Sequence, residues 1–308
     1  MTLISIRTEL LLRKTFRNLR GIATFTAITG NTVFWFVPIF LFGIIKLIIP
    51  IPGFRRALTR WIMTIGEYWV QGNAVLLGMR NPGRLDVRGI EGLSRQDWYL
   101  VISNHQTWVD IIVLQVVMIR RIPFLKFFIK QQLIWFPFLG LAWWAMDMPF
   151  MKRYSKSYLA KYPEKKGQDF EATRGACSKF RNTPTTVINF VEGTRFTLEK
   201  KVRRNSPFEH LLSPRAGGIA LALTSMGSMF DCVLDVTLVY PNGVSQFWAL
   251  CCGEFDGVIV DISRRPVERW MIEGDYENDR EYRSRFHKWL IQVWQEKDAR
   301  IRDLLGEP

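Results

Sequence analysis

A histidine and an aspartate five positions apart are the residues best suited to moving a proton. His105 follows an apolar, strand-like run over residues 98–103, and Asp110 opens a helix-like run. Side chains at the carboxyl end of a strand in an α/β sheet face the ligand crevice. A carboxylate bonded to one imidazole nitrogen fixes the tautomer and leaves the other nitrogen free to accept a proton. The pair is therefore a candidate general base for an alcohol.

Both residues also have a purely structural interpretation. Thr107-x-x-Asp110 resembles a capping box, in which the aspartate would only begin a helix. His105 would then be a histidine satisfied inside the fold. The spacing alone does not separate these two interpretations.

A second polar motif ends the strand expected over residues 185–191. It consists of Glu192, Gly193, Thr194 and Arg195. Glycine lets the backbone approach a ligand closely, and the planar fork of arginine matches a phosphate. A turn with a surface ion pair is the alternative. The basic run over residues 200–204 follows directly, and its position favours a functional role.

Taken together and in this order, the two motifs resemble those of the glycerolipid acyltransferase family. The first motif is NHQTWVD over residues 104–110 and the second is EGTR over residues 192–195. Members of this family acylate 1-acylglycerol-3-phosphate and other lysophospholipids. Residues 212–215 and 235–241 are most similar to bacterial inner-membrane members of the lysocardiolipin-acyltransferase-like branch. The resemblance covers about residues 84–262.

The resemblance implies a direct acyl transfer to a lysophospholipid hydroxyl. The donor would be an acyl thioester, either acyl-CoA or acyl-ACP (acyl carrier protein), and the acceptor 1-acyl-sn-glycerol 3-phosphate, giving phosphatidic acid. His105 would be the general base and Asp110 its orienting group, with no metal or other cofactor. The acceptor phosphate would be bound by Glu192, Gly193, Thr194 and Arg195, with Arg153 as a further candidate.

One position departs from the family pattern. A proline usually lies inside the late strand that is thought to shape the acyl-donor site. Here Asp235 occupies that region and Pro241 comes after it. The identity of the donor therefore rests least firmly on the resemblance.

Two other functions are compatible with parts of the sequence. The acceptor could be another lysophospholipid, such as lysocardiolipin, because the motifs do not distinguish acceptors. A basic, membrane-tethered binding protein would explain the net charge of +14. That charge suits nucleic acid or anionic membrane lipids, but a protein that only binds them has no need of the two motifs. We expect no nucleic-acid partner.

The first eighty residues predict a membrane anchor. Residues 21–45 contain no charged side chain, and as a helix they would cover a hydrocarbon core of about 30 Å. The basic residues upstream predict a cytoplasmic N-terminus. Because Pro50 to Gly53 form a turn signal, we expect a helical hairpin over residues 1–80. A single span with an external domain is the alternative. The expected location is a bacterial inner membrane, with the catalytic domain in the cytoplasm.

Residues 81–308 predict an α/β domain with a mixed sheet flanked by helices. The expected strands are 85–90, 98–103, 185–191, 232–239, 246–252 and 257–262. The expected helices are 107–120, 151–162, 168–181, 215–226 and an amphipathic C-terminal helix, 279–305. Residues 131–150 are apolar and rich in tryptophan, which fits either a core wall or a surface pressed on lipid.

Overall fold

The computed structural model describes residues 3–151, 162, 175, 180, 183–276 and 278–307. Its main sheet has six strands in the order β1-β8-β7-β2-β6-β3. All neighbouring strands are parallel except β7 and β8, which are antiparallel. The strands are β1 (Leu85–Arg88), β2 (Tyr99–Ser103), β3 (Leu125–Phe127), β6 (Thr186–Phe190), β7 (Cys232–Val239) and β8 (Val258–Arg265).

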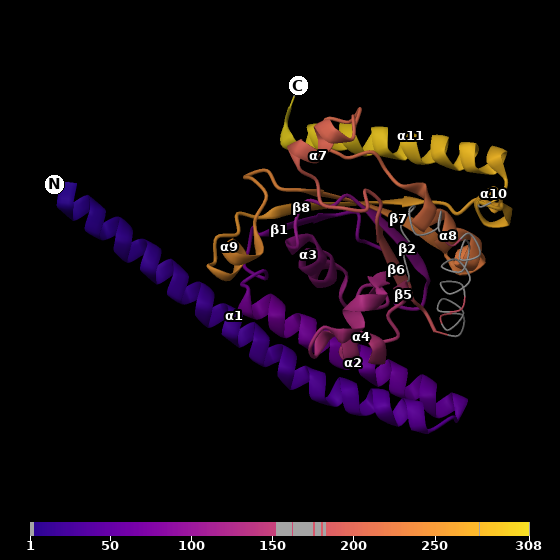
Figure 1. Cartoon of the computed structure of the whole chain (residues 1–308), viewed down its shortest axis with the longest axis horizontal. Helices are drawn as coiled ribbons and strands as arrows, with labels where there is room; N and C mark the ends of the chain where they lie inside the picture. Colours follow the sequence, from indigo (N-terminus) through magenta and orange to yellow (C-terminus); the bar gives the residue numbers. More distant parts are fainter. Residues whose placement is uncertain are drawn as a thin grey trace.

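Helices cover both faces of this sheet (Figure 1). One core cluster joins Leu100 and Ile102 of β2 to α8 (Ala216–Met226), α10 (Arg269–Glu273) and α11 (Arg280–Leu305). The other joins Tyr99 and Val101 of the same strand to α3 (Val109–Met118). Neighbouring residues of β2 thus point to opposite faces, and all five are buried, as expected for a central strand covered on both sides.

The N-terminal segment forms a helical hairpin. Helix α1 (Leu3–Ile48) and helix α2 (Pro52–Leu76) lie side by side and are joined by a three-residue turn (Figure 1). The amide of Asn31 donates to Asn73 Oδ1 at 2.9 Å, and Trp69 Nε1 donates to Thr32 Oγ1 at 3.1 Å. These polar contacts fix the two helices against each other. Proline at the first position of α2 fits the reversal.

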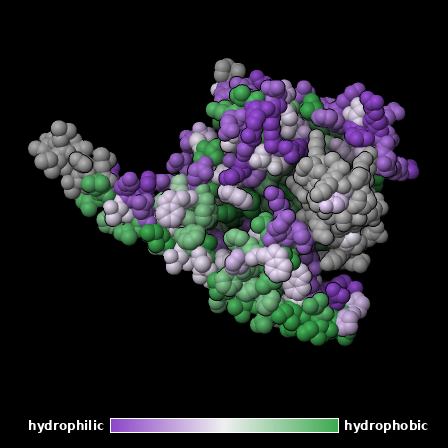
Figure 2. All heavy atoms as spheres, viewed as in Figure 1, coloured by the Kyte–Doolittle hydropathy of each residue, from purple (hydrophilic) through white to green (hydrophobic). Residues whose placement is uncertain are grey.

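Part of α1 is long and apolar enough to cross a membrane. The stretch from Leu11 to Ile48 meets this criterion by length and composition, and only 17% of its most apolar window is buried in the protein. A soluble core helix would be mostly buried. Figure 2 shows that the hairpin forms the most hydrophobic part of the visible surface, whereas the surface over α11 is hydrophilic.

The tryptophan-rich segment 131–150 has a buried side and an exposed side. Helix α4 (Leu139–Ala145) packs on α1, with Ala142 and Ala145 buried beside Ile39. The 3₁₀ turn η1 (Gln131–Trp135) before it has no buried residue, and Trp135 is 85% exposed. One side of this segment is therefore a core wall, and the other adds apolar surface next to the hairpin. The short strands β4 (Ile129–Lys130) and β5 (Phe150–Met151) flank it.

The α/β fold class with flanking helices is confirmed, and most expected elements lie within a few residues of those observed. The C-terminal helix is α11, capped at its start by Asp279. The expected helices 151–162 and 168–181 lie almost entirely outside the described residues. The division of the chain at residue 80 stays a prediction. The short strand β3 was not expected from the sequence.

The strand expected over residues 246–252 is wrong, because this segment forms helix α9 (Phe247–Cys251). Its aromatic and aliphatic residues suit a strand by propensity, but the segment packs against α1. Phe247 contacts Phe25 edge-to-face, and a Cβ on Gly21 would lie 2.7 Å from Cys252 Sγ. Adjacent Leu250 and Cys251 are both buried, which a helix allows and a one-sided strand does not. Tertiary packing therefore overrides local preference here.

Candidate active site

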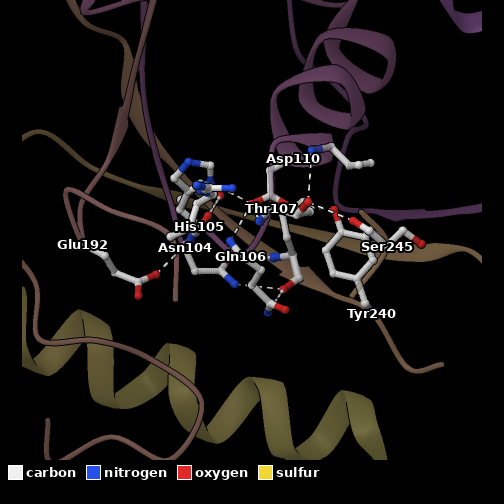
Figure 3. Close-up of polar contacts among 12 residues, drawn as sticks. Asn104, His105, Gln106, Thr107, Asp110, Glu192, Tyr240 and Ser245 are labelled. Carbon is white, nitrogen blue, oxygen red and sulfur yellow. Dashed lines mark hydrogen bonds and ion pairs between the residues drawn. The ribbon is translucent and has the colours of Figure 1, made fainter. Parts of the chain in front are cut away.

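The polar motifs meet at one edge of the sheet because the strands before them run in the same direction. Strand β2 pairs in parallel with β6 on one side and with β7 on the other. His105 follows the end of β2, Glu192 follows β6, and Tyr240 follows β7. Since the carboxyl ends of parallel strands share an edge, three segments distant in sequence become neighbours. Figure 3 shows side chains from all three segments around His105.

His105 and Asp110 form a hydrogen-bonded pair, which is one of the two arrangements compatible with their spacing. Nδ1 of His105 lies 2.8 Å from Asp110 Oδ2 (Figure 3). The histidine side chain is 12% exposed and the aspartate is fully buried. The imidazole also stacks on Phe190, with ring centroids 4.0 Å apart. Its second nitrogen, Nε2, has no hydrogen-bond partner within the described parts of the chain. The ring is thus held on one side, and its other nitrogen is available to a substrate.

Asp110 also lies in the first turn of helix α3, and its carboxylate bonds to the backbone just before that helix. Its Oδ2 accepts the backbone N–H groups of Gln106 at 2.6 Å and Thr107 at 2.9 Å, in addition to the imidazole. Its Oδ1 accepts the hydroxyl of Tyr240 at 2.6 Å. A buried carboxylate with this many donors is held in one orientation. It can therefore orient the imidazole and stabilise its protonated form.

Glu192 supports the backbone of the site. The residue is fully buried, with Oε1 accepting the backbone N–H of His105 and Oε2 that of Leu212, each at 2.9 Å. Burial raises the pKa of Glu192 to about 8, against the effects of these two hydrogen bonds and of Lys297. Both side-chain oxygens are thus occupied by backbone N–H groups, and the role of Glu192 in binding the acceptor phosphate stays a prediction.

The next three residues form a turn that faces outward. Gly193 has a φ of +68°, a left-handed conformation that favours glycine. Its backbone N–H donates to Phe190. Thr194 Oγ1 accepts from Lys200 Nζ at 3.1 Å, and the guanidinium of Arg195 lies over the exposed ring of Trp108, 5.1 Å from its centroid. Trp108 follows His105 by three residues, so this stacking places a cationic fork beside the histidine loop.

The basic run 200–204 divides into an inner and an outer pair. Lys200 donates to Arg195 O at 2.9 Å, and Arg204 donates to Glu192 O at 3.2 Å, so both hold the EGTR turn. Lys201 and Arg203 turn away from it, toward Glu209 and Glu199. Helix α7 (Leu198–Arg203), capped by Thr197, produces this alternation. Arg153, the further phosphate candidate, lies outside the described residues.

Two residues that complete the site were not expected from the sequence. Asn104 clamps β2 to β7, since its Nδ2 donates to Leu238 O at 2.9 Å and its Oδ1 accepts from Leu238 N at 2.8 Å. Tyr240 closes the Asp110 network, and burial beside that carboxylate raises the pKa of Tyr240 well above its usual value. Both directly follow a strand, and that position is the signal that could have identified them.

The fold matches a solved structure along nearly its whole length. It aligns with the crystal structure of the 1-acyl-sn-glycerophosphate acyltransferase PlsC from Thermotoga maritima with a TM-score of 0.56 and 17% identity, covering 95% of this chain and 97% of that one. At this identity the match supports the fold alone.

Curated relatives carry closely related names. The mouse 1-acyl-sn-glycerol-3-phosphate acyltransferase epsilon is 24% identical over 269 residues, which cover 78% of this chain and 67% of the mouse protein. The human delta protein is 26% identical over 56% of this chain, and the matched part is 44% of its own length. The chain thus spans between about half and two thirds of these relatives.

The family model described as acyltransferase matches residues 84–240. This range is about half of the chain. It contains β2, β6 and β7, the site loops after β2 and β6, and Tyr240 directly after β7. The site and the sequence comparisons therefore agree: the chain belongs to the acyltransferase family, within its glycerolipid acyltransferases, and is an enzyme that transfers acyl groups.

Proposed function

We propose that the enzyme transfers an acyl chain from acyl-CoA or acyl-ACP to the free hydroxyl of 1-acyl-sn-glycerol 3-phosphate. The observation that carries this proposal is the His105–Asp110 pair, with Nδ1 held at 2.8 Å and Nε2 free of partners in the described chain. This arrangement suits proton removal from an alcohol. A protein that only binds lipid would have no use for a histidine oriented in this way.

In the proposed reaction, the acceptor hydroxyl is the nucleophile. As its oxygen bonds to the thioester carbonyl carbon, its proton passes to Nε2 of His105. Collapse of the tetrahedral intermediate breaks the carbon–sulfur bond, and the imidazolium returns the proton to the departing thiolate. Asp110 stabilises the transient positive charge, since its carboxylate lies on Nδ1. General-base assistance of this kind contributes about 10²–10⁴-fold in rate.

We assign binding of the acceptor phosphate to the outward-facing turn after β6. Arg195 presents a planar fork beside the histidine loop, and Thr194 adds a hydroxyl. Lys200 and Arg204 keep the turn in place and add positive charge. A phosphate bound there would place one end of the lysolipid near Trp108, three residues beyond His105.

The same proposal places the enzyme on a bacterial inner membrane, with its catalytic domain in the cytoplasm. The hairpin carries exposed apolar side chains along α1 and α2, among them Phe16, Phe34, Leu47 and Trp61. Arg13 and Arg17 lie on α1 before the uncharged stretch, where basic residues favour the cytoplasmic side. Anionic lipids would be attracted to this positive charge.

The test is an acyl-transfer assay on membranes enriched in the protein. Lysophosphatidic acid is supplied with acyl-CoA or acyl-ACP, and the wild type is compared with His105→Ala. A matched control is His287→Ala, because His287 is an exposed histidine of α11. We expect phosphatidic acid from the wild type and the control, and a loss of about 10²–10⁴-fold for His105→Ala.

Three results would contradict the proposal. Activity of His105→Ala close to that of the wild type would exclude His105 as the base. Turnover with lysocardiolipin or another lysolipid, but none with lysophosphatidic acid, would reassign the acceptor. No product with any lysolipid would favour the binding-only interpretation.

A further inference from the structure

Two buried side chains of helix α11 reach the backbone segments that support the active site. Trp294 and Lys297 lie three residues apart on the face of α11 that covers the sheet (Figure 1). Both are fully buried, at 0% and 2% exposure. Neither belongs to the two motifs.

Trp294 connects α11 to the backbone of His105 through three consecutive hydrogen bonds. Its Nε1 donates to Leu212 O at 3.1 Å. The N–H of Leu212 donates to Glu192 Oε2, and Glu192 Oε1 accepts the N–H of His105. Every group in this series is buried or part-buried, so an unmade bond would leave a polar group unsatisfied. The position of the His105 backbone therefore depends on α11.

Lys297 connects the same helix to the strand that orients Asp110. Its Nζ donates to Val236 O at 2.6 Å and to Thr237 Oγ1 at 3.1 Å, and forms an ion pair with Asp235 Oδ1 at 2.6 Å. These residues lie in the middle of β7. The end of β7 carries Leu238, which Asn104 clamps, and Tyr240 follows it to contact Asp110.

We propose that α11 is a positioning element of the active site, in which Trp294 and Lys297 hold the two backbone segments that orient His105 and Asp110. This inference rests on the proposed function, because it concerns the geometry of the same proton transfer. It also gives a role to Asp235, the residue that departs from the family pattern. Asp235 is the anchor for Lys297.

A purely structural role does not explain why these positions are charged. Replacing a buried ion pair by well-packed apolar residues is often neutral or stabilising. Lys297 and Asp235 nevertheless lie inside the core, joined by Arg265, which contacts Asp235 at 2.9 Å and Glu296 at 2.8 Å. An apolar pair would lack the positive charge of Lys297, which acts on Glu192 through space.

The charge of Lys297 favours the carboxylate form of Glu192. A carboxylate is the better acceptor for both backbone N–H groups, because a protonated carboxyl carries no charge and has less acceptor capacity on its hydroxyl oxygen. Among the described residues, the charged and titratable groups near Glu192 are His105 and Asp110 from the loop after β2, Arg204 after α7 and Lys297 on α11. Arg215 before α8 lies against Gly193, and Asp235 on β7 and Arg265 on β8 belong to the ion pairs around Lys297. Burial and then Asp110 raise the pKa of Glu192, whereas the backbone N–H groups of His105 and Leu212 and, to a smaller extent, Lys297 lower it.

The test compares the pH profile of kcat for wild type, Lys297→Met and the matched control Lys288→Met. Lys288 lies on the exposed face of the same helix. Without the buried positive charge, Glu192 keeps its proton to higher pH. We therefore expect the acid limb of the Lys297→Met profile to move to higher pH and activity to recover partly in alkaline buffer. Lys288→Met should follow the wild-type profile.

Trp294→Phe provides a second test that keeps the core filled. It removes the N–H donor to Leu212 O together with part of the indole ring, and for the lost hydrogen bond we expect kcat to fall about fivefold. The KM for lysophosphatidic acid should stay unchanged, because the acceptor turn keeps its own contacts. Thermal unfolding of each variant establishes that it is folded.

The proposal is overturned by an unchanged kcat in Trp294→Phe. It is equally overturned if folded Lys297→Met shows the wild-type pH profile, or if it loses the same factor at every pH, which would indicate a purely structural role. If Lys297→Met does not fold, Trp294→Phe decides alone. Failure of the proposed function is distinguishable, because His105→Ala would then be as active as the wild type.

Discussion

The two loops that form the site differ in how completely their polar groups are satisfied inside the protein. In the loop of residues 104–110, the side chains of Asn104, Thr107 and Asp110 are buried, and each bonds to a partner on another segment or to the histidine. In the loop of residues 191–197, only Glu192 is held in this way. Thr194 and Arg195 are partly exposed, and the Arg195 guanidinium stacks on Trp108.

In the proposed reaction, this difference separates two tasks within one site. Proton transfer requires a base held in one orientation, and burial with full hydrogen bonding achieves that. Binding a phosphate requires a cation that can still reach the ligand, so Arg195 keeps its donors available. Glu192 joins the two loops, since it belongs to the second but holds the backbone of the first.

The largest effect after loss of His105 itself should come from the first loop. Asp110→Asn places an NH₂ group among several N–H donors, so the imidazole is no longer held in one orientation. The variant also lacks the negative charge that stabilises the imidazolium. We expect kcat to fall by about 10²–10⁴-fold with little change in KM. Asp231→Asn is the control, because Asp231 accepts a backbone N–H from Trp98 at the opposite end of β2. If Asp110→Asn and Asp231→Asn had equal kcat and KM, Asp110 would have no role in the mechanism.

The second loop should show the opposite kinetic pattern. Arg195→Ala removes a charge-assisted hydrogen bond of about 1.5–3 kcal/mol, so kcat/KM for lysophosphatidic acid should fall about ten- to a hundredfold. KM for the thioester should not change. Arg203→Ala is the control, because this exposed arginine pairs only weakly with Glu199 at 3.7 Å. If only the KM for the thioester rose, Arg195 would be assigned to the donor site instead.

A smaller effect is expected from the outermost member of the Asp110 network. Tyr240→Phe removes one of the hydrogen bonds to this carboxylate, so we expect kcat to fall about fivefold. Tyr99→Phe is the matched control, because its hydroxyl contacts Asp97 and Ser94 away from the site. If Tyr240→Phe lowers only the melting temperature, as Tyr99→Phe should, Tyr240 has no part in orienting the pair.

The smallest effect concerns the residue that joins the loops, and it appears as a pH dependence of stability. The pKa of Glu192 is raised from 4.5 to about 8 in the folded chain, so the native state binds a proton more tightly than the unfolded state. Its contribution to the free energy of unfolding therefore decreases as pH rises from about 4.5 to about 8. Glu192→Gln removes this contribution. The melting temperature of the wild type relative to Glu192→Gln should decrease across that range, and a constant difference would contradict the assignment.

Strand and helix periodicity predicted much of this architecture, because the buried elements follow their sequence patterns. Strand β7 runs from Cys232 to Val239 as expected, and α11 is amphipathic as predicted, with Phe286, Leu290, Val293, Trp294 and Ile301 on its buried face. The strand predicted over residues 246–252 was wrong because packing on α1, more than two hundred residues away in sequence, determines the conformation of this segment. Local preference contains no information about such a partner.

Sequence predicted the His105–Asp110 pair more completely than it predicted the surroundings of Glu192. The residue types of His105 and Asp110 restrict what they can do, and their contact is confirmed. Glu192 was placed in the right motif, but its contacts with two backbone amides were not predicted, because sequence does not show which oxygens backbone amides will occupy. The contact between Lys297 and Asp235 was not predicted, because only the folded topology brings their elements together. From sequence, a lysine in an amphipathic helix is expected on the surface.

The most direct test of this division of tasks is a structure of the enzyme with lysophosphatidic acid bound and no acyl donor. The account predicts the free hydroxyl of the glycerol within about 3 Å of His105 Nε2, and the phosphate on Arg195 and Thr194. A phosphate bound against His105, or a hydroxyl that points away from Nε2 while the phosphate lies elsewhere, would contradict it.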